Sequence, residues 1–303
     1  MLKRFFLPLA LFGSLVLITA CSTTKKEEKG ISEAELYQAA EEQLASEQWE
    51  AAIKNLQSLE ENFPFGTYAE QGQLELIYAY FSSQKPDEAI ATANRFIRLH
   101  PQHRNVDYAY YMLGMSSFTK DKGMFERVMP ADMTQRDPGA ARESLGNFTQ
   151  LLNRFPDSTY AADAKKRMLF LRNLLARYEI HVANYYFKRG AYLAAVGRGR
   201  YVLENYPKTP AIPDSLAVMV QGYHLLGMQD HAEEFLNVLR TNYPEYPALN
   251  KNGEFDYDYA AENKYNNWFG RITLGLFTKH DFIGFDTREV YDAEYRKPER
   301  VTN

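Results

Sequence analysis

The stretch Ala89-Ile-Ala-Thr-Ala-Asn-Arg-Phe-Ile-Arg-Leu-His-Pro101 decides the fold, because its pattern occurs five times in the chain. Each copy has a small residue twelve positions before a proline, a large apolar residue five positions before it, and an aromatic ring directly before it. The small residues are Ala52, Ala89, Ser144, Ala195 and Ala232, and the large ones are Leu59, Phe96, Leu151, Val202 and Leu239. Such offsets mark one face of a helix, and a proline disfavours helical backbone in its predecessor. The pattern predicts five helices that each end before their proline.

An amphipathic segment precedes each of these helices, so the sequence predicts helix pairs. The pairs are 33–47 with 49–62, 67–82 with 86–99, 105–119 with 138–153, 159–188 with 190–204, and 211–226 with 229–241. Pro86 and Pro138 suit the first turn of a helix, where no backbone N–H is needed. The segment 121–137 is expected to be a loop, and no segment alternates as a strand.

These helix pairs resemble the tetratricopeptide repeat. The expected fold class is therefore all-α, a solenoid of about five tetratricopeptide-like helix pairs with a C-terminal extension. The concave face of such a solenoid binds peptides and protein segments, although the fold alone does not fix the function. We expect four regions: a signal peptide (1–20), a tether (21–32), the solenoid (33–244) and the extension (245–303).

The first twenty residues have the features of a secretory signal. Lys3 and Arg4 precede an apolar stretch, 5–18, which is too short for a comfortable transmembrane helix. Ile18-Thr-Ala-Cys21 resembles the lipobox of bacterial lipoproteins, and Cys21 is the single cysteine of the chain. The resemblance implies an S-diacylglycerol and an N-acyl group on Cys21 and, with Ser22 next, sorting to the outer membrane. The alternative is a plain secretory signal with an incidental cysteine.

The composition offers little catalytic chemistry. A single cysteine excludes an intrachain disulfide, and the six histidines show no metal-ligand spacing, so we expect neither a metal nor a cofactor. The net charge of −4 argues against a nucleic-acid partner. The sequence contains no H-E-x-x-H motif and no phosphate loop, and we do not expect an enzyme.

The charges are unevenly distributed along the chain. Residues 27–75 hold 12 acidic and 2 basic side chains, whereas residues 165–200 hold 9 basic side chains and only one acidic residue, Glu179. Two interpretations stay open: two solvated faces, or two docking surfaces of opposite sign that steer partners. Arg198 and Arg200 lie in the basic stretch, and arginine suits bidentate pairing with a carboxylate.

Several longer motifs resemble the BamD family, the lipoproteins of the outer-membrane β-barrel assembly machine. They include Phe63-Pro-Phe-Gly-Thr-Tyr68, Leu74-Glu-Leu-Ile-Tyr-Ala-Tyr80 and Arg95-Phe-Ile-Arg-Leu99, and the resemblance runs from the lipobox to about Pro244. It implies a non-enzymatic subunit anchored by its lipid alone at the periplasmic face of the outer membrane. The implied partners are a POTRA domain of BamA, the lipoproteins BamC and BamE, and unfolded outer-membrane proteins.

The resemblance also implies two sites. Arg198 matches by position an arginine of the family's BamA-facing region, and Arg189 and Arg200 are candidate contacts beside it. A groove for the C-terminal signal of unfolded outer-membrane proteins is implied near the four residues Phe65, Gly66, Tyr68 and Tyr80. Phe65 and Gly66 could equally be turn residues.

Other interpretations of the chain are a tetratricopeptide lipoprotein that pilots an outer-membrane secretin, and a cell-wall enzyme on a repeat scaffold. The extension contains a segment, 251–261, that we expect to be loose, and an apolar segment, 268–277. We expect the extension to fold back over the last repeat. The alternatives are a contact with BamA or another subunit, or insertion at the membrane interface.

Overall fold

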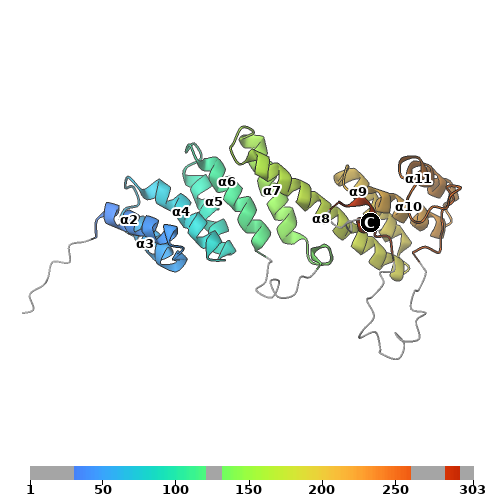
Figure 1. The fold of residues 1–303 in the computed structure, drawn as a ribbon, viewed down its shortest axis with the longest axis horizontal. Coiled ribbons are helices and arrows are strands. Elements are labelled where there is room, and N and C mark those ends of the chain that lie inside the picture. The colour runs from blue at the N-terminus through green and yellow to red at the C-terminus, as the bar shows by residue number, and fades with distance from the viewer. Residues whose placement is uncertain (1–30, 121–131, 261–283, 294–303) are drawn as a thin grey trace, which may run out of the picture.

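A computed structural model describes residues 31–120, 132–260 and 284–293, which form an elongated row of paired helices (Figure 1). The pairs are α2 (Glu33–Ala45) with α3 (Trp49–Asn62), α4 (Ala69–Ser82) with α5 (Pro86–Leu99), α6 (Val106–Thr119) with α7 (Gly139–Arg154), α8 (Ala161–Lys188) with α9 (Tyr192–Asn205), and α10 (Ile212–Leu225) with α11 (Gln229–Asn242). Two short elements are η2 (Met133–Gln135) and α13 (Arg288–Tyr291). The described ranges contain no strand, only an isolated bridge between Leu249 and Phe255. The predicted all-α solenoid of five helix pairs is confirmed.

The repeated pattern marks the core of the solenoid. All ten small and large residues of the pattern are at most 1% exposed. Each closing helix ends alike: the ring residue before the proline donates its backbone N–H to the carbonyl four residues earlier, at 2.8 to 2.9 Å. Each proline thus ends the second helix of its pair at the same position of the repeated pattern, which keeps the pairs in register.

Small residues let successive helices approach closely. Ser144 of α7 donates its hydroxyl to the carbonyl of Gly114 in α6, at 2.8 Å. A Cβ atom on Gly114 would lie 2.6 Å from the ring of Phe148. The size of the side chains at these positions therefore sets the distance between the helices. None of the helices in the described ranges has the length and apolar character that a membrane span requires.

The structure corrects two local predictions. Pro138 caps α7 from outside, and Gly139 is the first helical residue, whereas Pro86 does occupy the first turn of α5. The segment predicted to be loose is packed in its described part, 251–260. Phe255 is buried, and the ring of Tyr257 stacks on His224 with the centroids 3.8 Å apart. Aromatic side chains in this segment find apolar partners that the sequence alone could not locate.

The described part of the extension folds back, but over more than the last repeat. We call Gly284-Phe-Asp-Thr-Arg288 the strap; it lies against α8 and α10, the first helices of the fourth and fifth pairs. The ring of Tyr291 in α13 lies 5.7 Å from that of Tyr243, the residue that directly follows α11. The apolar segment 268–277, the signal and Cys21 fall outside the described residues.

Candidate partner-binding sites

Three of the predicted groove residues lie in the turn between α3 and α4, beside α2. The side chain of Phe65 is fully exposed. Gly66 faces the carboxylate of Glu33, and a Cβ atom there would lie 2.2 Å from its Oε1. Tyr68 donates its backbone N–H to the same carboxylate at 2.6 Å, and its ring stacks on Tyr37 with the centroids 4.4 Å apart. This turn is closely packed and presents one exposed ring.

The fourth predicted residue, Tyr80, lies near the other end of α4. It lies twelve positions after Tyr68, which is about 18 Å along the helix axis. Tyr80 is buried, and its hydroxyl accepts a hydrogen bond from Gln57 at 2.8 Å. It lines a cavity of about 570 Å³ between α3, α4 and α5, together with Gln57, Glu60, Glu61, Leu76, Glu88, Ala91, Thr92, Arg95 and Arg98. The four predicted residues therefore do not line a single pocket, because the length of α4 separates them.

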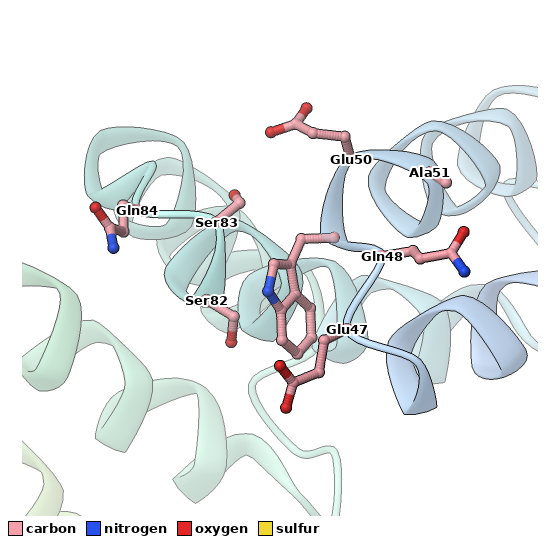
Figure 2. A pocket seen from close by; sticks show the side chains of 8 residues that line it. Glu47, Gln48, Glu50, Ala51, Ser82, Ser83 and Gln84 are labelled. Carbon is pink, nitrogen blue, oxygen red and sulfur yellow. The ribbon is translucent and has the colours of Figure 1, made fainter.

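A second cavity, of about 590 Å³, lies between the turns that join α2 to α3 and α4 to α5 (Figure 2). It is lined by Glu47, Gln48, Trp49, Glu50, Ala51, Ser82, Ser83 and Gln84. Glu47 and Gln84 both adopt left-handed backbone, with φ of 58° and 63°. The carboxylate of Glu50 is paired with Lys85 at 2.7 Å. This cavity contains none of the predicted site residues.

Arg198, the predicted BamA contact, belongs to a three-residue cluster. The carboxylate of Glu179, only 1% exposed, accepts from Arg198 of α9 at 2.9 Å and from Arg142 of α7 at 3.0 Å. The two guanidinium groups lie 5.8 Å above the ring of Tyr186 and 5.7 Å above the ring of Tyr178. Burial disfavours the charge on Arg198, but the hydrogen bonds and charge interactions with Glu179 and Tyr186 together outweigh it and raise the pKa of Arg198. We call Arg142, Glu179 and Arg198 the arginine clamp.

The other two predicted arginines lie apart from the clamp carboxylate. Arg200 is exposed and donates to the hydroxyl of Tyr223 at 2.5 Å. Arg189 ends α8 and lies 5.8 Å over the ring of Tyr185. Both side chains are held by aromatic residues, so their charges stay available at the surface.

Part of the basic stretch is neutralised by ion pairs, one at the surface and one inside the fold. Arg167 pairs with Asp163 at 2.5 Å, and Arg177 pairs with Asp214 of α10. The latter two side chains are 3% and 0% exposed. The basic surface is therefore smaller than the count of charges along the sequence indicates.

Asp214 is the most heavily used polar residue that the sequence did not single out. Besides Arg177, it accepts from the hydroxyl of Tyr246 at 2.9 Å, and from the hydroxyl and N–H of Thr287 at 2.8 Å and 3.0 Å. Burial, followed by the charge of Asp214, raises the pKa of Tyr246 well above its ordinary value. A lone Asp after a proline carries no sequence signal for such a role.

His224 and His231, which lie seven positions apart in the sequence, serve as packing residues. His224 stacks on Tyr257, and His231 lies 5.2 Å from the ring of Tyr223. Within the described ranges no group of three or more His, Cys, Asp or Glu side chains is arranged to hold a metal ion.

The five stacked helix pairs define the class of the molecule, an all-α solenoid of the tetratricopeptide type. The chain is 37% identical over 251 residues to outer membrane protein assembly factor BamD of Xylella fastidiosa (strain Temecula1), covering 81% of this chain and 86% of that protein. The corresponding protein of Neisseria meningitidis serogroup A is 39% identical over 238 residues, covering 77% and 89%. The family model described as YfiO, outer membrane lipoprotein, matches residues 29–239. The chain belongs to the BamD family of outer membrane protein assembly factors.

The wider comparison agrees with this assignment. The assembly factor BamD of Vibrio cholerae is 35% identical over 229 residues, covering 76% of this chain and 95% of that protein. Among solved structures, the crystal structure of MamA protein aligns with 71% of this chain and 95% of its own chain at 15% identity. The TM-score of 0.34 is too low to support an assignment. The predicted family is confirmed, and its members are named as assembly factors and outer membrane lipoproteins, not as enzymes.

Proposed function

We propose that this chain is a lipid-anchored scaffold of the outer-membrane β-barrel assembly machine that binds BamA and receives unfolded outer-membrane proteins. The lipid on Cys21 holds it at the periplasmic face of the outer membrane. A POTRA domain of BamA docks on the fourth repeat, and BamC and BamE are its further partners. Family membership supports the general role. The arginine clamp supports BamA binding by the fourth repeat, and the cavity that Tyr80 lines supports substrate binding by the N-terminal repeats.

The arginine clamp is the observation that carries the BamA-binding part. Arg142 and Arg198 are 46% and 39% exposed, while the carboxylate that fixes them is buried. One negative charge holds two positive ones, so the surface keeps a surplus positive charge in a fixed geometry. A guanidinium has five N–H donors, and those not engaged by Glu179 can pair with a carboxylate of the partner. A preorganised pair of this kind favours an acidic docking surface.

The cavity that Tyr80 lines supports the substrate-binding part. It combines a tyrosine ring with Arg95 and Arg98, and Arg95 is already paired with Glu60 at 2.7 Å. A peptide that ends in an aromatic residue carries a ring and a carboxylate. The cavity offers apolar surface for the ring and the two arginines for the carboxylate, beside the acidic side chains of Glu60, Glu61 and Glu88. Phe65 lies in the same repeats as a separate exposed ring.

The test is co-purification of BamA with the full-length lipidated protein. Arg142→Gln and Arg198→Gln should each lower BamA recovery several-fold, and the double variant should lower it further. Arg154→Gln is the matched control, because Arg154 also belongs to α7 and lies over a ring, that of Tyr110, away from the clamp. Unchanged recovery from the double variant would remove the clamp from the interface. Loss of a secretin with normal porin levels on depletion would favour the pilot-protein alternative.

A further inference from the structure

The backbone of the strap is hydrogen-bonded by side chains of the helices on which it lies. Asn184 of α8 donates its amide N–H to the carbonyl of Phe285 at 2.8 Å and accepts the N–H of the same residue at 2.9 Å. One asparagine thus satisfies both backbone groups of one strap residue, as a neighbouring strand would. The two residues are 101 positions apart in the sequence.

A pocket receives the one large apolar side chain of the strap. Phe285 is fully buried, and its ring centroid lies 6.0 Å from that of Phe187, 6.2 Å from Phe255 and 6.1 Å from Tyr259. The preceding residue must be glycine, because Gly284 has φ of 145° and a Cβ atom there would lie 2.4 Å from Cγ of Asn184. The site therefore selects an aromatic residue that follows a glycine.

A second polar contact is made to Thr287, two positions after Phe285. Asp214 accepts both the N–H and the hydroxyl of Thr287. Its other partners, Arg177 and Tyr246, belong to the body of the protein, so the carboxylate keeps an ion pair and a hydrogen bond without the strap. Arg177 also donates to the carbonyl of Pro210 at 2.9 Å. The Asp214 part of the site thus keeps its partners in the body of the protein without the strap, whereas both hydrogen bonds of the Asn184 side chain go to the strap.

Ion pairs hold Arg288, the last residue of the strap. Arg288 pairs with Asp132 at 2.9 Å and donates to the hydroxyl of Thr134 at 3.1 Å, which ties it to the connection between α6 and α7. Asp286 lies 2.8 Å from the same guanidinium.

We propose that this face of α8 and α10 is a binding site for an extended peptide, and that the strap is its resident ligand, supplied by the same chain. Backbone hydrogen bonds that give affinity, together with pockets for alternate side chains that give specificity, are the general form of extended-peptide recognition. The ligand class is a short segment with the order glycine, aromatic residue, aspartate, threonine, in which the aspartate lies 3.7 Å from the guanidinium of Arg177. The same segment added as a separate peptide takes this place once the resident strap is removed.

The experiment uses the full chain with the strap released by Gly284→Val and Phe285→Ala. Valine at 284 collides with Asn184, and alanine at 285 empties the aromatic pocket, while the receiving helices are unchanged. Faster amide exchange across 284–292 reports the release. The probe is a fluorescent synthetic peptide of residues 283–292, measured by anisotropy.

The peptide should bind the released chain saturably and the unaltered chain at least tenfold more weakly, because the resident strap competes at a high effective concentration. A peptide with Thr287→Ser should bind, and peptides with Thr287→Val or Phe285→Ala should lose at least tenfold in affinity. Asn184→Leu in the released chain should weaken binding to a similar extent.

Three outcomes would overturn the proposal. The first is a released chain that keeps its helical circular dichroism but does not bind the peptide. The second is equal binding to the released and unaltered chains. The third is loss of the helical signal on release, which would make the strap part of the core instead of a ligand.

Discussion

Arg177 of α8 and Asp214 of α10 form an ion pair in which both side chains are almost completely buried. The pair joins the fourth repeat to the fifth, and it lies beneath the strap. Removing one partner of a buried pair leaves a charge without compensation, which is far more costly than the net worth of the pair.

We therefore predict that Asp214→Asn lowers the free energy of unfolding by about 3 to 5 kcal/mol. The double variant with Arg177→Met should lose less than the sum of the two single variants, because neither charge is then left alone. Urea denaturation of all three proteins measures the coupling. The exposed pair of Lys85 and Glu50 is the control, and Glu50→Gln should cost less than about 1 kcal/mol. Additive losses would contradict the prediction.

Two adjacent alanines test the repeat pattern. Ala195 is fully buried where α9 meets its neighbours, whereas Ala194 is exposed. Ala195→Leu should destabilise the chain by about 1 to 3 kcal/mol or more, because a closely packed helix contact has no room for the added carbons. Ala194→Leu places the same side chain in solvent and should change stability by less than about 0.5 kcal/mol. Equal midpoints of thermal unfolding for the two variants would show that size at the pattern position is unimportant.

Two glycines provide a test with opposite signs. Gly114→Ala should destabilise by about 1 to 3 kcal/mol, because its Cβ atom would collide with the ring of Phe148. Gly146 lies within α7 with open space around it. Gly146→Ala should therefore stabilise the chain by about 0.5 to 1 kcal/mol through helix propensity. Differential scanning calorimetry reports both changes, and a shift of the same sign for both would be inconsistent with this packing.

Acid sensitivity follows from Asp163. A hydrogen bond from Tyr111 at 2.7 Å, together with the contact to Arg167, holds the pKa of Asp163 below its ordinary value of 3.8. A lowered pKa in the folded state means that the stabilisation is complete above about pH 4. It is lost as the pH falls through the folded-state pKa. Asp163→Asn should flatten this part of the stability profile, measured as the urea midpoint between pH 5 and pH 2.5, whereas the profile of Asp157→Asn, in the turn before α8, should keep its slope.

Substitution of Glu179, the buried member of the arginine clamp, distinguishes the effect of arginine orientation from the effect of net charge. Glu179→Gln keeps a hydrogen-bonding side chain but removes the charge that fixes Arg142 and Arg198. We expect a loss of about 1 to 3 kcal/mol in stability and a several-fold fall in BamA recovery, although the surface gains positive charge. Glu204→Gln, at an exposed position of α9, changes net charge equally and should affect neither quantity. Stronger BamA binding by Glu179→Gln would show that net charge matters more than orientation.

The candidate sites could be predicted only in part from the sequence. Arg198 carries a signal in its basic surroundings and family position, but Arg142, an arginine on a different helix, carries none. The groove prediction placed Tyr68 and Tyr80 together because the family resemblance implies a groove near both, yet α4 holds them at opposite ends. Cavities form between helices, so proximity along the chain does not identify the residues that line them.

The repeat architecture can be predicted from the sequence alone, because every feature of the repeated pattern is local. Helix periodicity, a small residue for close approach and a proline stop all act within thirteen residues, and they set the length and buried face of each helix. The tertiary structure alone decided which distant groups meet. Arg177 finds Asp214 across 37 positions, and Asn184 finds Phe285 across 101. Such pairs depend on how whole helices stack and where the extension returns, and the physical forces that select them, burial and charge compensation, act only after the helices are in place.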